Sequence, residues 1–188
     1  MQIFSPMTVS QFASMAILLA LAVRTDLRWR RIPNRLVLLG IAIAVGTHGV
    51  SIASGQISLA GPAWWLTLAG MVAGFGLLLP LYLMRAMGAG DVKLMAMVGA
   101  FIGFPAILTA TLYTMAAGGI LALLLMLRRG VAAQAISNLR FMLTSLAVRV
   151  STGQGAGIEP MQTTAARMPY ALAIAIGTGA ALIWPLSF

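Results

Sequence analysis

The sequence predicts an all-α membrane protein that crosses the bilayer six times and keeps both termini on the outer side. Composition gives the first indication, because 61% of the 188 residues are hydrophobic and only 8% are charged. Soluble proteins carry about 25% charged residues. The mean hydropathy of +0.99 agrees with a chain whose main solvent is lipid. Unpaired backbone groups are costly in that solvent, which favours a helix for every crossing.

The distribution of basic residues predicts the topology. All 12 Lys and Arg residues lie in three segments, 24–35, 85–93 and 128–167. Six helices in series place these segments on one side of the membrane and leave the other side without a basic residue. Because basic loops stay in the cytoplasm, we expect this side to be cytoplasmic. We therefore assign the net charge of +9 to contacts with membrane lipid and expect no nucleic-acid partner.

Uninterrupted apolar runs define the first three predicted helices, which cover residues 9–23, 36–50 and 63–84. Five arginines fill the connection between the first two runs. Pro33 stands in this connection just before the second run, where a proline suits a helix start. The connection between the second and third runs carries no charge and is interrupted by glycine and proline.

The next apolar stretch, residues 94–127, is too long for one crossing of a hydrocarbon core about 30 Å thick. Gly103-Phe104-Pro105 is the natural break. It gives a short fourth helix over residues 92–104 and a fifth over 106–127. The sixth helix begins near Arg167-Met168-Pro169-Tyr170 and reaches Trp184.

We expect one transmembrane domain over residues 1–188, with residues 128–167 as a cytoplasmic loop. Apolar residues recur at helical spacing within this loop, namely Val131, Ala135, Leu139, Met142, Leu143 and Leu146. The spacing predicts an amphipathic helix at the membrane interface. A helix in a soluble loop is the alternative.

The residue types that are present exclude several kinds of catalytic site. The chain has no cysteine, so thiolate metal sites and a cysteine nucleophile are excluded. The only histidine, His48, is expected as an interfacial side chain at the outer end of the second helix. The three acidic residues, Asp26, Asp91 and Glu159, all fall on the opposite side. This separation argues against a Ser–His–Asp triad and a zinc site, and we expect neither a metal nor another cofactor.

A serine–lysine pair would have to use Lys93, the only lysine. A helix that starts at Asp91 places Lys93 about 200° from it around the helix axis. We therefore expect Lys93 to extend towards the lipid headgroups rather than into a site with Asp91.

Two aspartates remain as candidates for catalysis. Asp26 ends the first apolar run, and Asp91 lies in Gly88-Ala89-Gly90-Asp91-Val92-Lys93, directly before the fourth helix. Carboxylates at membrane depth are costly, so they indicate function. We predict that Asp26 and Asp91 meet as a pair that shares one proton, so that one acts as a base while the other donates. In the alternative, Asp91 only caps a helix and Asp26 only pairs with Arg24 or Arg30.

The glycines of this motif are expected to shape the site. Gly88 and Gly90 can take positive φ angles and admit another backbone at close range. Asp91 would then lie at a helix N-terminus, where the helix dipole and free N–H groups favour an anion.

Several of these motifs together resemble a known family. Gly88-Ala89-Gly90-Asp91 before a membrane helix resembles the GxGD signature of membrane aspartyl proteases. Asp26-Leu27-Arg28, followed by Ile32-Pro33-Asn34, resembles the first catalytic motif of the type IV prepilin peptidases. Asp91-Val92-Lys93 and Met168-Pro169-Tyr170 are also similar to that family. The resemblance implies that Asp26 and Asp91 are catalytic. It implies motif or positioning roles for Gly88, Gly90, Lys93, Arg28, Pro33, Asn34, Pro169 and Tyr170.

The larger members of that family carry a cytoplasmic insertion with paired CxxC motifs, which is associated with methylation. This chain has no cysteine and only a short connection after Asp26. It resembles the short, peptidase-only form that serves Flp-type, tight-adherence pili. The resemblance implies an aspartic endopeptidase of the bacterial inner membrane that removes the short leader from a prepilin at the cytoplasmic face. No methyltransferase activity is expected.

Two other functional classes remain open at this point. A transporter could use Asp26 and Asp91 as carriers of protons or cations. Their location on one side argues against this class, because a carrier site is expected near the membrane midplane. A non-catalytic scaffold could use its Gly- and Ala-rich helices as a packing surface.

Overall fold

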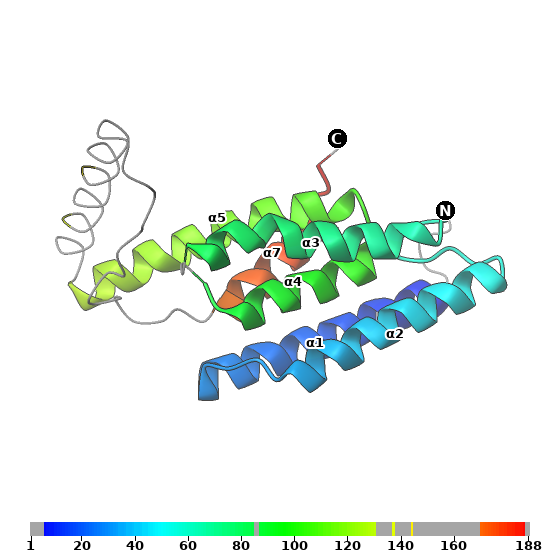
Figure 1. The fold of residues 1–188 in the computed structure, drawn as a ribbon, viewed down its shortest axis with the longest axis horizontal. Coiled ribbons are helices and arrows are strands. Elements are labelled where there is room, and N and C mark those ends of the chain that lie inside the picture. Colours follow the sequence, from blue (N-terminus) through cyan, green and yellow to red (C-terminus); the bar gives the residue numbers. More distant parts are fainter. Residues whose placement is uncertain (1–5, 85–86, 131–136, 138–143, 145–169, 187–188) are drawn as a thin grey trace. The chain divides into compact units, whose positions relative to one another are not determined.

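The computed structural model describes residues 6–84, 87–130, 137, 144 and 170–186, and these residues form helices and no strand. The named helices are α1 (Pro6–Trp29), α2 (Asn34–Ala53), α3 (Trp65–Leu83), α4 (Ala89–Ile102), α5 (Ala106–Arg129) and α7 (Tyr170–Ile183) (Figure 1). The chain is therefore an all-α protein, as predicted.

Four of these helices, α1, α2, α3 and α5, are long and apolar enough to cross a membrane. Large apolar side chains such as Leu38 and Val72 are exposed on them, as expected for surfaces that contact lipid. The protein is thus a multi-pass membrane protein. The other two described helices, α4 and α7, have 14 residues each, or about 21 Å, which is less than the thickness of a bilayer core. Six crossings therefore remain a prediction.

The chain divides into two compact units, Met1–Gly118 with Pro169–Phe188, and Gly119–Met168. The first unit contains α1 to α4, the first half of α5 and α7. The second unit begins with the remainder of α5. The predicted amphipathic helix in the 128–167 loop lies almost entirely outside the described residues.

Helix α4 is the centre of the first unit. It contacts α1, α2, α3 and α7, and it lies between the α1–α2 pair and α3 (Figure 1). From Asp91 to Ile102, every residue except Lys93 is buried. A helix that is apolar on all sides is expected in the interior, and neighbours on every side allow α4 to be shorter than the helices that face lipid.

Glycines allow α3 and α4 to pack at very short range. Gly70 and Gly74 of α3 lie one turn apart, and a Cβ atom at either position would overlap the backbone of α4. Gly99 of α4 has the same relation to the backbone of α3 at Gly70. Close approach through small residues is the usual basis of helix association in membranes, because lipid supplies no hydrophobic driving force between helices.

The predicted break after the fourth helix is confirmed. Gly103 takes a left-handed φ of 70° directly after α4, and α5 begins at Ala106. A Cβ atom at Gly103 would also meet the backbone of Ala60, so glycine is required there for two reasons.

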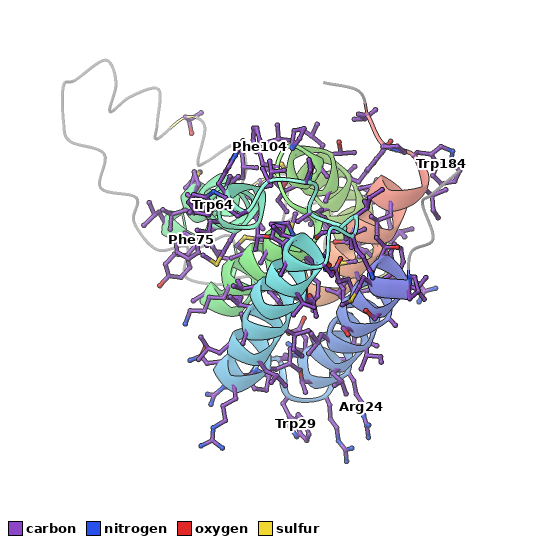
Figure 2. The ribbon with its side chains drawn as sticks, turned by 90° about the vertical axis from the view of Figure 1, so that its right-hand side faces the viewer. Arg24, Trp29, Trp64, Phe75, Phe104 and Trp184 are labelled. Carbon is purple, nitrogen blue, oxygen red and sulfur yellow. The ribbon has the colours of Figure 1, made fainter. Side chains whose placement is uncertain are left out.

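Helix α1 extends further than its apolar run. It continues through Arg24 and Asp26 to Trp29, because the long arginine side chains can point outwards while Thr25 bonds the carbonyl of Ala22. The helix ends at Arg30, which has a φ of 51°. Arg24 and Trp29 project away from the ribbon of α1 (Figure 2). Asp26 therefore lies one turn inside the helix.

His48 is buried, contrary to the expectation of an exposed interfacial side chain. Its Nδ1 contacts the Oγ of Ser58, and its Nε2 lies 3.1 Å from the carbonyl oxygen of Ala63. The side chain of Gln11 accepts a hydrogen bond from the N–H of Leu59 at 2.8 Å and also reaches Ser58. The α2–α3 connection thus folds back over His48 and joins it to α1. Such long-range contacts leave no local pattern in the sequence.

Candidate active site

Asp26 is buried by its position on α1. The buried residues of this helix recur at helical spacing, and they are Thr8, Gln11, Met15, Leu18, Leu19, Ala22 and Asp26. Asp26 therefore ends a stripe that faces the other helices. Only 7% of its surface is exposed. Its Oδ2 accepts a hydrogen bond from the main-chain N–H of Ala171 at 3.2 Å, and its charge interacts with that of Arg30.

The Ala171 donor comes from the first turn of α7. The first N–H groups of a helix have no partner within the helix, so they are available to a carboxylate. Sequence reasoning did not identify Ala171. The signal was present in the Met168-Pro169-Tyr170 motif, which marks a helix start and therefore a set of free N–H groups.

Asp91 lies at the N-terminus of a helix, as predicted, but α4 begins at Ala89 rather than at residue 92, so Asp91 belongs to its first turn and is 8% exposed. Gly88 is the residue that precedes the helix, and its N–H donates to Oδ2 of Asp91 at 3.1 Å. This bond satisfies one of the unpaired N–H groups at the helix start and fixes the side chain near the helix axis. The carboxylate also lies at the positive end of the helix dipole.

Asp26 and Asp91 lie close enough for their charges to repel each other. Tyr170, the first residue of α7, is half-buried and interacts electrostatically with Asp91. Three helices that are distant in sequence, α1, α4 and α7, therefore contribute to one buried acidic site. The chemistry that it can support is acid–base chemistry, because two interacting carboxyl groups can hold one proton between them.

The motif glycines differ from expectation in conformation. Gly88 has a φ of −81° and a ψ of 153°, and Gly90 lies within α4 without a positive φ. The expectation of positive φ is therefore wrong. Close packing explains the glycine at position 90, because a Cβ atom there would lie only 3.2 Å from the Cβ of Ile32. A Cβ atom on Gly88 would lie 3.2 Å from Oδ2 of Asp91.

Of the motif residues that follow Asp26, Pro33 and Asn34 lie at the start of α2, whereas Arg28 is exposed at the end of α1. Pro33 precedes α2 directly, and Asn34 accepts a hydrogen bond from Nζ of Lys93 at 3.1 Å. Lys93 is thus bonded to α2 as well as exposed. Arg28 is exposed, and its guanidinium lies 5.4 Å from the ring centre of Trp29. No described contact connects Arg28 with the two aspartates, and Pro169 lies outside the described residues.

Metal-binding groups are sparse in the described residues. No cluster of three or more His, Cys, Asp or Glu side chains occurs among them. The only described histidine, His48, belongs to the buried polar group that also contains Gln11 and Ser58. Gln11 and Asp26 lie at opposite ends of the buried stripe of α1, about 22 Å apart at about 1.5 Å per residue.

Comparisons with known proteins identify the family of the chain. No curated protein and no solved structure matches the chain. Residues 13–123 match the type IV leader peptidase family, and this segment includes both Asp26 and Asp91. The matched segment covers more than half of the chain and confirms the resemblance to this family. The chain therefore belongs to the type IV leader peptidase family.

Proposed function

We propose that the protein is an aspartic endopeptidase that uses Asp26 and Asp91 to remove the short leader from Flp-type prepilins at the cytoplasmic face of the bacterial inner membrane. The observation that carries the proposal is the pair of buried carboxylates on α1 and α4, whose charges interact, in a chain of the leader peptidase family. Burying two carboxyl groups together in a membrane protein costs free energy, and a catalytic role explains why the protein keeps them.

The proposed reaction needs only the two carboxyl groups and a water molecule. The ionised aspartate removes a proton from water, and the water oxygen bonds to the peptide carbonyl carbon. The protonated aspartate stabilises the developing charge on the carbonyl oxygen by donating to it. The aspartate that took the proton from water then gives it to the leaving amine as the C–N bond breaks, and the diol returns a proton to the other aspartate. The products are the carboxyl end of the leader and the new amino terminus of the pilin.

Neighbouring main-chain N–H groups orient both carboxyl groups. A carboxylate that accepts main-chain hydrogen bonds is held in one rotamer, which keeps both acids oriented without a metal ion. Asp26 has such a donor in Ala171, and Asp91 has one in Gly88. We propose that Tyr170 keeps Asp91 in place from the side of α7.

The proposed orientation is six crossings with both termini outside. The clustering of the basic residues in three alternate segments supports it. Helices α4 and α7 would cross as short helices surrounded by the longer ones. This orientation places Asp26 and Asp91 at the cytoplasmic end, where a substrate whose leader is still in the cytoplasm can reach them. The transporter alternative finds no support in the family match.

A cleavage assay tests this function directly. Purified protein in detergent would be incubated with a peptide that contains a prepilin leader and the start of the pilin helix, and with a peptide of the same composition in scrambled order. We expect one cut at the leader junction, with an unmethylated new amino terminus by mass spectrometry. Glu159→Gln removes the third acidic residue of the chain and serves as the matched control. No cleavage by correctly folded protein would contradict the proposal.

A further inference from the structure

The connection between α1 and α2 and the first residue of α2 contact α4 on both sides of Asp91. The side chain of Ile32 packs closely against Gly90, where a Cβ atom would fit only after a shift of a few tenths of an ångström. Two residues further along, Asn34 at the start of α2 accepts the hydrogen bond from Lys93. Gly90 and Lys93 are three positions apart and therefore lie on the same face of α4. Ile32 and Asn34 thus hold one face of α4 at two points.

The other end of the same connection is attached to the turn that carries Asp26. The N–H of Arg30 donates to the carbonyl oxygen of Asp26 at 2.8 Å, and the left-handed φ of Arg30 turns the chain away from α1. Pro33 has a fixed φ of −65°, and its carbonyl oxygen accepts the N–H of Leu36 in the first turn of α2. The four residues between the helices therefore form a short, well-restrained link from Asp26 to the start of α4.

We infer that Lys93 is a positioning residue, which acts with Asn34 to fix the rotation of α4 and thereby the location of the Asp91 carboxylate opposite Asp26. The inference rests on the proposed function. Asp91 projects about 200° away from Lys93 around α4, so Lys93 acts through the helix and not by touching the reacting atoms. Its bond to Asn34 gives it a role beyond an extended contact with lipid headgroups.

The size of the effect follows from helix geometry. A side-chain group about 5 Å from the helix axis moves about 1 Å when the helix rotates by about 10°. A displacement of this size in a catalytic group can lower the rate about 100-fold. Loss of the Lys93–Asn34 bond leaves the Ile32–Gly90 contact and the packing of Met97 against Gly40 on this side of α4.

Substitutions at the two bonded positions test the inference. Lys93→Met should lower kcat for the prepilin-like peptide by about 10- to 100-fold with little change in KM, because substrate contacts are kept. Asn34→Ala should have a similar effect, and the double variant should be no worse than either, because both changes remove one bond. Asn34→Asp keeps an oxygen acceptor and should recover most of the rate. Arg128→Met removes a cation from the second unit and should leave kcat unchanged.

A cross-link gives a sharper test. The Cβ position at Gly90 lies 3.2 Å from that of Ile32, a few tenths of an ångström below the separation of about 3.5–4.5 Å in disulfides, so a small shift allows the bond to form. The chain has no cysteine, so Ile32→Cys and Gly90→Cys introduce the only two thiols. Combined with Lys93→Met, the oxidised protein should regain kcat, and a reducing agent should remove the gain. A role of Lys93 in chemistry or in lipid binding predicts no such rescue.

The rate of disulfide formation measures the restraint without any substrate. The two thiols should form their disulfide faster when Lys93 is present than in the Lys93→Met background. Equal rates, or a complete disulfide that restores no activity to an otherwise active enzyme, would overturn the inference. If the wild-type protein cleaves no prepilin, the proposed function fails, while the oxidation rates still decide whether Lys93 restrains α4. If the two thiols lower the folded yield, additive losses of kcat in the Lys93 and Asn34 variants contradict the inference.

Discussion

Gly70→Ala should separate the two helices that hold Asp91 in place. A Cβ atom at Gly70 would lie 2.7 Å from the Cα of Gly103 and would also overlap the carbonyl oxygen of Gly99. Ordinary contact requires about 3.4 Å or more, and the Cβ atom would lie about 1 Å closer than this to the Gly99 oxygen, so α3 and α4 must move apart by about 1 Å. Overpacking of this kind costs about 1–3 kcal/mol. Because α4 carries Asp91, the same shift should also lower kcat for peptide cleavage.

Gly76→Ala is the matched control, because Gly76 lies in the same helix and a Cβ atom there meets nothing within 4 Å. Both substitutions bring the same gain in helix propensity, about 1 kcal/mol, which cancels in the comparison. Unfolding of the two variants in mixed micelles, followed by circular dichroism, should therefore show Gly70→Ala to be less stable by about 1–3 kcal/mol. Equal unfolding free energies would refute the packing argument.

Three further predictions concern catalysis, the buried polar group around His48 and the topology. A pair that works with one shared proton should give a bell-shaped dependence of kcat/KM on pH. EDTA should leave the activity intact, and activity that is lost to the chelator and restored by zinc would contradict the mechanism. His48→Ala should cost about 1–3 kcal/mol of unfolding free energy, because it removes a partner of the buried Oγ of Ser58. The value of kcat should persist because the aspartates are distant, and a large loss of kcat in folded protein would contradict the separation of the two regions. Single cysteines from Ser54→Cys and Ser187→Cys should react with an impermeant thiol reagent outside intact cells, whereas one from Ser151→Cys should not; labelling at position 151 would overturn the orientation.

Features that depend on local pattern were predictable from the sequence. Apolar runs located the long helices, and Gly103-Phe104-Pro105 marked the break between α4 and α5. The placement of Asp91 in the first turn of α4 followed from the glycine-rich start of the motif. The single histidine and the absence of cysteine leave the two aspartates as the candidates for catalysis.

Features that depend on contacts between distant segments were not predictable. Nothing near Asp26 in the sequence indicates that its partner is the N–H of Ala171. The space requirement at Gly90 arises from Ile32, in a different connection, and the partner of Lys93 is Asn34 on α2. His48 is buried because the α2–α3 connection folds over it. In each case the tertiary neighbour sets the role of a residue whose local pattern suggested another.

The central claim is that Asp26 and Asp91 act as one catalytic unit. The most direct test measures kcat for a prepilin-like peptide with Asp26→Asn, Asp91→Asn and the double variant, after confirming that each protein inserts and folds. Each single variant should abolish cleavage, and the double variant should be no worse than either, because residues that act as a unit have non-additive effects. A single variant that keeps more than about a tenth of the wild-type kcat, which corresponds to a barrier raised by less than about 1.4 kcal/mol, would contradict the claim.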